Sequence, residues 1–146
     1  MNLERYSYFT DDYKEYVFFS EGPKGRIKKV VQYRKINDNP VVYNLGFGDE
    51  NTVTGKIDGR VVTNNNDRDK VLATVASTVI EFSKHYGKQT IYIEGETPAR
   101  IRLYQIGISA FLTEISTDFK ILGVRQGVLE EFQKNVNYDA FFIKKK

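Results

Sequence analysis

The first third of the chain has the residue pattern of β structure. β-Branched and aromatic residues dominate residues 15–20 and 26–36, and the intervening EGPKG supplies the glycine and proline of a hairpin loop. A third strand is expected over residues 40–48, after the turn signal NDNP. The stretch 55–63 gives a weaker signal for a fourth strand, because Asp58 and Gly59 also suit a tight turn.

Further along the chain, the hydrophobic period changes to three and four residues. This spacing places one apolar stripe on a helix, made of Leu72, Val75, Val79, Phe82 and Tyr86. Asp67 suits the N-cap position and Gly87 suits the C-terminal stop. The pattern therefore predicts a helix over residues 67–86.

A second helix is expected after a short strand at residues 89–95. Thr97 is placed as its N-cap and Pro98 as its first residue, where the missing proline N–H costs nothing. The helix is predicted to end near Ser116 or Thr117. Its apolar stripe consists of Ile101, Tyr104, Ile108, Phe111 and Ile115.

Two arginines stand near the start of this helix, where the positive end of the helix dipole disfavours cations. Arg100 and Arg102 either hold a bound anion, pair with carboxylates elsewhere in the fold, or point to solvent. At about 100° per residue, Arg100 lies beside the apolar stripe and Arg102 lies well away from it. We therefore expect Arg100 at a packed boundary and Arg102 nearer solvent, with Thr97 as a further candidate for contact with an anion or a partner.

The last third is expected to add a strand at residues 119–127 and a closing strand at residues 139–146. The stretch 128–137, which includes the acidic pair Glu130 and Glu131, is interpreted as a solvated loop or a short helix. The predicted order is β-β-β-(β)-α-β-α-β-β. This order predicts a single α+β domain over residues 1–146, with a mainly antiparallel sheet and two principal helices packed on it.

Composition narrows the chemistry that the chain can perform. The absence of cysteine excludes disulfides, thiolate metal sites and cysteine nucleophiles. His85, the only histidine, is placed beside a helix end that favours a cation, so a structural role is preferred over catalysis. Asp67 and Asp69 suit either a divalent cation or an ordinary helix start, and capping is the preferred interpretation. No metal or cofactor is therefore expected.

Neither secretion nor membrane insertion is indicated by the sequence. The N-terminus lacks the apolar run of a signal peptide, and no uninterrupted apolar stretch reaches about 18 residues. A chain without cysteine also fits a reducing compartment. We therefore expect a cytoplasmic protein.

One predicted strand concentrates basic residues on a single face. Alternation puts Arg26, Lys28 and Arg34 on the same side of the strand at residues 26–36. With the lysines at 24 and 144–146 they form a candidate surface for a nucleic-acid or protein partner, and tyrosines 6, 8, 13, 16 and 33 are candidates for stacking on a single strand. The competing interpretation is that one face of an antiparallel hairpin meets water and that basic residues protect it from aggregation.

The second half of the chain resembles the C-terminal half of the Gcn5-related N-acetyltransferase fold. The resemblance covers residues 67–146 and rests on the element order and on ARIRLYQIGI, which is similar to the family's A-x-x-L-Y-x-x-x-G-F helix, although Gly107 comes one residue early. It implies that Tyr104 protonates the departing coenzyme A thiolate. The family's phosphate loop needs glycine, whereas this chain has NNNDRDKVLATV with Asp67 and Asp69 there. Binding of the coenzyme in the usual manner is therefore not expected.

The stretch GETPARIRLY also resembles a set of small, uncharacterised bacterial proteins. They carry G-x-T-P-A-R-x-R-L-Y, followed by ILGVRQG and a final strand like YDAFFI, all of which occur here. This resemblance implies no activity. The sequence thus favours a non-enzymatic binding domain with a protein or nucleic-acid partner, and the alternative is an N-acyltransferase-like enzyme that uses Tyr104 as general acid.

Overall fold

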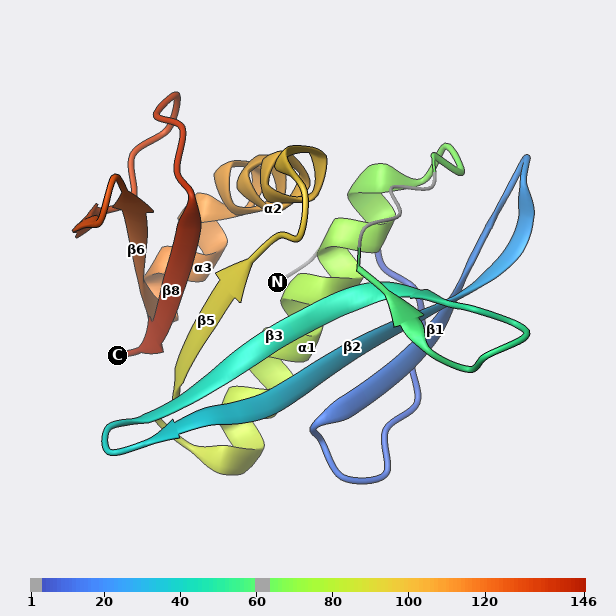
Figure 1. Cartoon of the computed structure of the whole chain (residues 1–146), viewed down its shortest axis with the longest axis horizontal. Helices are drawn as coiled ribbons and strands as arrows, with labels where there is room; N and C mark the ends of the chain where they lie inside the picture. Colours follow the sequence, from blue (N-terminus) through green and yellow to red (C-terminus); the bar gives the residue numbers. More distant parts are fainter. Residues whose placement is uncertain (1–3, 60–63) are drawn as a thin grey trace.

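The described helices pack on one side of a single sheet. In residues 4–59 and 64–146, which the computed structural model describes, eight strands form this sheet and three helices cover one of its faces (Figure 1). The strands are β1 (Glu15–Gly22), β2 (Gly25–Asp38), β3 (Val41–Glu50), β4 (Ile57–Asp58), β5 (Thr90–Glu94), β6 (Phe119–Arg125), β7 (Val128–Glu131) and β8 (Ala140–Lys145). The helices are α1 (Arg68–Tyr86), α2 (Pro98–Ala110) and α3 (Leu112–Asp118). The predicted α+β class with a mainly antiparallel sheet is confirmed.

The sheet contains one parallel pair among its described strands. The strand order is β1-β2-β3-β5-β8-β6-β7, with β4 paired to β3, and only β3 and β5 run parallel. Their pairing begins at Val42 and Thr90 and ends at Asn44 and Tyr92. Beyond these residues the two strands separate, and the starts of α1 and α2 lie near the resulting opening (Figure 1).

The core lies between the helices and the helix-facing residues of the strands. The Tyr33 ring stacks on Phe82 with centroids 4.3 Å apart, and its hydroxyl lies 2.8 Å from the Thr78 hydroxyl. Tyr16 is also fully buried in this cluster. The prediction that tyrosines 16 and 33 stack on a nucleic acid is therefore wrong, because alternation turns them away from the basic face and into the core. Tyrosines 6, 8 and 13 are half-buried and pack against the same core.

The helix predicted over residues 97–117 is interrupted. Phe111, with φ −108° and ψ 14°, leaves helical geometry and separates α2 from α3. The apolar stripe continues through this break, since Ile108, Phe111 and Ile115 are all buried in the core. The sequence did not reveal the break because the spacing of three and four residues is kept across it.

The stretch expected to be a loop or short helix contains a strand. β7 pairs antiparallel with β6 through a turn at Gln126 and Gly127, both with positive φ. Such two-residue turns favour glycine because it adopts positive φ without steric cost. Glu130 on β7 forms an ion pair with Arg125 at 3.2 Å. The Gln-Gly turn, which the prediction assigned to the end of the preceding strand, was the available signal for this hairpin.

The glycines in two sequence motifs mark close packing. A Cβ atom on Gly95 would lie 2.6 Å from the backbone nitrogen of Ile101, so glycine allows β5 to end directly against α2. A Cβ atom on Gly123 would lie 2.3 Å from the Tyr138 ring, which packs flat against β6. Parts of GETPARIRLY and ILGVRQG therefore serve the fold.

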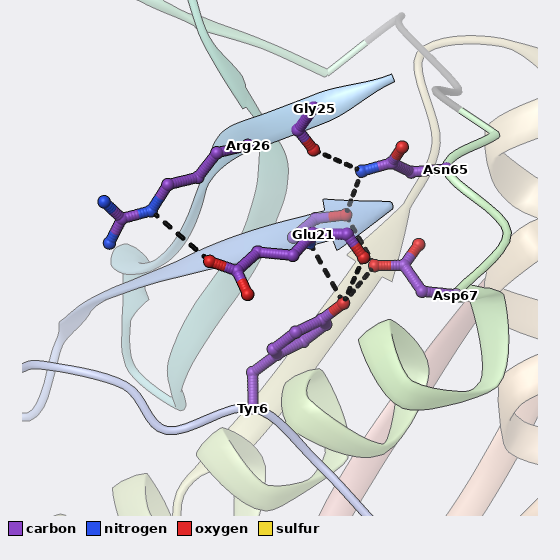
Figure 2. Close-up of polar contacts among 7 residues, drawn as sticks. Tyr6, Glu21, Gly25, Arg26, Asn65 and Asp67 are labelled. Carbon is purple, nitrogen blue, oxygen red and sulfur yellow. Dashed lines mark hydrogen bonds and ion pairs between the residues drawn. The ribbon is translucent and has the colours of Figure 1, made fainter. Parts of the chain in front are cut away.

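The two predicted N-caps behave differently. Thr97 caps α2 as predicted, since its hydroxyl accepts a hydrogen bond of 3.2 Å from the Arg100 N–H. Asp67 stands at the N-cap position of α1, but its carboxylate does not cap the helix. It accepts hydrogen bonds from the Tyr6 hydroxyl at 2.6 Å and from the Ser20 hydroxyl at 2.5 Å (Figure 2). The capping prediction for Asp67 is therefore wrong, because these donors come from distant parts of the chain.

Asn65 extends this network and holds the segment before α1 against the β1–β2 turn. Its side-chain oxygen accepts a hydrogen bond of 2.7 Å from the Lys24 N–H. Its amide donates to the Gly25 carbonyl at 3.0 Å (Figure 2). The same amide donates to the Ser20 hydroxyl at 3.0 Å. The start of α1 is thereby held in place by three separate segments.

The fourth predicted strand is described only in part. β4 consists of Ile57 and Asp58, which pair antiparallel with Glu50 and Asp49 of β3. Residues 60–63 of the predicted stretch lie outside the described residues.

We expect Thr97→Ala to lower the free energy of unfolding by about 1 kcal/mol, because the Arg100 N–H loses its capping acceptor. Chemical denaturation measures this change. Thr113→Ala, an exposed threonine in α3, is the matched control and should change the value by no more than about 0.5 kcal/mol. Equal effects of the two substitutions would contradict the assigned cap.

We expect Tyr6→Phe to lower the free energy of unfolding by about 1.5 kcal/mol, since a hydrogen bond to a carboxylate is lost. Burial and the hydrogen bond to Asp67 raise the pKa of Tyr6 in the folded state. A raised pKa favours the neutral phenol on folding, so this stabilisation is complete below about pH 10 and is lost as pH rises further.

The Tyr6→Phe experiment is therefore repeated at pH values on either side of about 10. The difference between the parent and the variant should shrink at the higher pH. Tyr13→Phe is the control, because the Tyr13 hydroxyl has no hydrogen-bond partner among the described residues, whereas its ring stacks on His85. A difference that grows with pH would show that the Tyr6–Asp67 bond is wrongly assigned.

Candidate functional site

A cleft of about 970 Å³ opens between the start of α1 and the start of α2. Its lining comes from the N-terminal segment, β2, β3, the residues before α1, and both helices. The described residues that line it are Glu4, Lys29, Phe47, Asn64, Asn65, Asn66, Asp67, Arg68, Asp69, Lys70, Val71, Ala73, Ala99, Arg100, Arg102, Leu103, Ile106, Ala110 and Phe111. The cleft lies on the helix-covered side of the sheet, where β3 and β5 have separated.

Two buried cations lie near the same aromatic ring in this cleft. Lys29 is 4 % exposed and Arg100 is 2 % exposed. The Arg100 guanidinium carbon lies 5.0 Å from the centroid of Phe47, and the Lys29 ammonium nitrogen lies 6.0 Å from it. Both distances are within the range of a cation–π interaction. Lys29 also forms an ion pair of 2.5 Å with Asp49.

Tyr104 helps to hold the Arg100 side chain in position. The two side chains are hydrogen-bonded in the described structure. Burial raises the pKa of the Tyr104 phenol to about 12, and the charge of Arg100 acts in the opposite direction. Tyr104 is therefore a neutral hydrogen-bond partner of Arg100 at physiological pH.

The two arginines of α2 both line the cleft but differ in exposure. Arg100 is buried, whereas Arg102 is exposed. This difference agrees with the angular positions deduced from the helical period. Thr97 is one turn away and does not line the cleft among the described residues, because its hydroxyl caps α2.

The mouth of the cleft carries charges of both signs. Lys70 forms an ion pair of 3.4 Å with Glu4, and Arg68 forms one of 3.4 Å with its neighbour Asp69. Across the described lining, five cationic side chains face three acidic ones. Since the Asp67 side chain does not cap α1, the first turn of that helix adds the positive end of its dipole to the mouth.

One wall of the cleft is apolar. It is formed along α2 by Leu103, Ile106, Ala110 and Phe111, with Val71 and Ala73 on the α1 side. The cleft therefore combines a cationic end at the helix starts with an apolar surface along the helices.

The basic stripe predicted on β2 lies elsewhere. Arg26, Lys28 and Arg34 face away from the helices, and they do not line the cleft among the described residues. Two of them have carboxylate partners: Arg26 lies 3.8 Å from Glu21 and Lys28 lies 2.9 Å from Glu50. The strand register produces both pairs. Arg26 is directly opposite Glu21 on β1. Lys29 is opposite Asp49 on β3, so the preceding residue Lys28 lies beside Glu50, the residue that follows Asp49.

The other residues considered for chemistry are separated from the cleft. Tyr104 lines a small apolar cavity of about 50 Å³ between the helices and the sheet instead. His85 stacks on Tyr13 with ring centroids 4.1 Å apart. In the described part of the chain, no group of three or more His, Cys, Asp or Glu side chains is arranged to hold a metal ion.

Sequence reasoning missed Lys29 and Phe47. Lys29 stands on β2 between Ile27 and Val31, so alternation puts a lysine on the apolar, helix-facing side of the strand. A charged residue on a buried face is an unusual feature and was the available signal for a site. Phe47 gave no such signal, because an aromatic residue on the buried face of a strand is ordinary.

None of the described helices has both the length and the hydropathy that a bilayer crossing requires.

Comparisons with known proteins place the chain in a family. We found no significant match to a curated protein or to a solved structure. A model of a family of unknown function, DUF6934, matches residues 2–146. Since this match spans all but the first residue and includes every described residue of the cleft, the chain belongs to the DUF6934 family of unknown function.

Proposed function

We propose that the chain is a non-enzymatic binding domain whose ligand is an amphipathic anion held in the cleft between α1 and α2. The observation that carries this proposal is the buried cation Arg100 over the Phe47 ring at the sheet end of the cleft, where Lys29, already ion-paired with Asp49, lies over the same ring. Arg102 at the mouth adds a third, exposed cation.

The burial of these cations supports a binding role for physical reasons. Charges in a water-poor cleft attract an anion more strongly than charges on an exposed surface, because the effective dielectric constant is lower. Arg100 is also positioned in advance by Phe47 and Tyr104. A side chain that is already ordered loses less conformational entropy when the ligand binds.

The position of the cleft in the fold supports the same proposal. Ligands of sheets with parallel strands bind outside the carboxyl ends of those strands, where the helix N-termini gather. Here β3 and β5 form such a pair, and the starts of α1 and α2 line the cleft beside it. A helix start favours phosphate or carboxylate groups because its N–H groups and its dipole are positive, and at α1 the carboxylates of Asp67 and Asp69 oppose this attraction.

The lining suggests the chemical class of the ligand. The cationic end suits a phosphate, pyrophosphate or carboxylate group, and the wall of Leu103, Ile106 and Phe111 suits an apolar or aromatic portion. The stripe on β2 is less suited to this role, since Arg26 and Lys28 face away from the cleft and from its apolar wall.

We expect the folded protein to bind anilinonaphthalene sulfonate, a fluorescent probe that has both an anionic group and fused apolar rings. Sodium pyrophosphate should displace the probe. Arg102→Gln should weaken binding about tenfold, because one charge-assisted contact at the mouth is lost. Arg100→Gln should abolish displacement by pyrophosphate while the protein remains folded by circular dichroism.

Lys84→Gln is the matched control, since it removes an exposed cation from the last turn of α1, away from the cleft lining. Its affinity for the probe should equal that of the parent. If the folded parent does not bind the probe at low salt, or if Lys84→Gln weakens binding as much as Arg102→Gln does, the cleft is not the binding site.

Acyl transfer is the second candidate function. It is favoured by the position of α1, because the resemblance to the acetyltransferase fold would put the coenzyme pyrophosphate at the start of this helix, and that start lines the cleft. Two observations weigh against it. The described residues before and in the first turn of α1 contain no glycine, and Tyr104, the general acid implied by the resemblance, does not line the cleft.

We expect no transfer of acetyl groups from acetyl-CoA to amines, because Tyr104 does not line the cleft and its hydroxyl is hydrogen-bonded to Arg100. Titration calorimetry with acetyl-CoA and an amine-acetylation assay are performed on the parent and on Tyr104→Phe. Micromolar binding, together with activity that disappears in Tyr104→Phe, would make acyl transfer the better proposal.

A further inference from the structure

The sheet face opposite the helices carries an ordered block of side chains on three adjacent strands. On β5, β8 and β6 the residues that point away from the core form two neighbouring rows. The first row is Tyr92, Phe142 and Leu122, and the second is Thr90, Lys144 and Lys120. None of these six residues lines the cleft among the described residues, so this surface is separate from the proposed anion site.

Two aromatic rings lie side by side in the first row. The ring centroids of Tyr92 and Phe142 are 4.9 Å apart, and the ring planes are inclined at 48°. Both side chains are partly exposed, and Leu122 next to Phe142 is partly exposed as well. Aromatic side chains on the central strands of a sheet whose other face is covered by helices form a platform on which nucleic-acid bases stack.

Two lysines lie directly opposite each other in the second row. Lys120 and Lys144 are cross-strand partners on β6 and β8, and both are exposed. Like charges in this position repel each other, and within the described residues neither lysine forms an ion pair. An anionic partner would remove this repulsion, so the block is complementary to negative charge.

Further charged side chains, of opposite sign, flank the two rings on different sides. Arg34 is exposed and lies in line with the ring row, since it pairs with Asn44, which pairs with Tyr92. At the other end, the Tyr92 hydroxyl donates a hydrogen bond of 2.9 Å to Glu94. Phosphates are therefore attracted to the lysine side of the rings and repelled from Glu94 and from the exposed Glu131, which pairs with Leu122 at the end of the ring row.

The dimensions match a short stretch of single strand. Adjacent strands are about 4.8 Å apart and every second residue advances about 7 Å, so the block covers about 10 Å by 7 Å. This area accommodates two bases on the rings with their phosphates near the lysines. A protein partner fits less well, because lysine is depleted in the centres of protein interfaces.

We propose that this face binds single-stranded nucleic acid, with bases stacked on Tyr92 and Phe142 and with phosphates contacted by Lys120, Lys144 and Arg34. The proposal does not depend on the function of the cleft. It shares Arg34 with the stripe expected on β2 but otherwise differs from it, because the central strands supply the rings and because Lys120 and Lys144 have no carboxylate partner within the described residues.

The test measures fluorescence anisotropy of labelled oligouridine and oligodeoxythymidine of about ten nucleotides, from about 50 mM salt upwards. We expect the double variant Lys120→Gln, Lys144→Gln to bind at least tenfold more weakly than the parent. Its plot of log affinity against log salt should be less steep by about 1.4, since two phosphate contacts to a single strand are lost. Binding to either oligomer supports the proposal, and the comparison between them identifies the preferred sugar.

Two matched controls accompany this variant. The double change Arg26→Gln, Lys28→Gln removes the same charge from the same face, at positions that already have carboxylate partners, and should leave the salt slope unchanged. For the rings, Tyr92→Leu should weaken binding about tenfold, whereas Phe9→Leu, at a ring that is 74 % exposed elsewhere, should not.

Several results would overturn the proposal. These are no binding of the parent to either oligomer at low salt, an unchanged affinity in the double lysine variant, or an equal loss in the Arg26 and Lys28 variant. Equal affinity for a DNA duplex would also overturn it, because paired bases cannot stack on the rings. The exposed lysine positions keep the test valid even if Tyr92→Leu does not fold.

Discussion

The short parallel pairing of β3 with β5 is the constraint on which the site depends. Parallel strands require a crossover connection, and α1 provides it by packing its apolar stripe across the sheet. The pairing ends at Asn44 and Tyr92, so the strands separate toward their carboxyl ends. The starts of both α1 and α2 then lie at this opening, and the cleft with Lys29 and Arg100 is the result.

Cationic side chains are buried on one face of the sheet and exposed on the other. On the helix side, cations are buried in a cleft and held by aromatic side chains, as Arg100 is by Phe47 and Tyr104. On the open side, cations are exposed. Those on β2 are partly neutralised by glutamates on neighbouring strands, whereas Lys120 and Lys144 face each other. This contrast separates the anion cleft from the single-strand surface as two independent hypotheses.

The fold was predictable where local rules apply. The helical period located both helices, and Thr97 was recognised as a cap because its acceptor bonds an N–H only three residues away. Prediction failed where a distant partner decided the outcome. Asp67 has an ideal sequence context for a cap, but hydroxyls 47 and 61 residues away bind its carboxylate. Glu130 was assigned to a loop or short helix, although β7 pairs with β6.

The sequence by itself determined the α+β class, the starts of α1 and α2 and the different exposure of Arg100 and Arg102, because these follow from periodicities and caps that act over a few residues. Only the tertiary structure decided which chemistry-bearing residues meet. Lys29, Phe47 and Arg100 come from β2, β3 and α2, and no spacing in the sequence records that these elements converge. Strand register likewise decided which cations have carboxylate partners, since pairing joins residues that are distant along the chain.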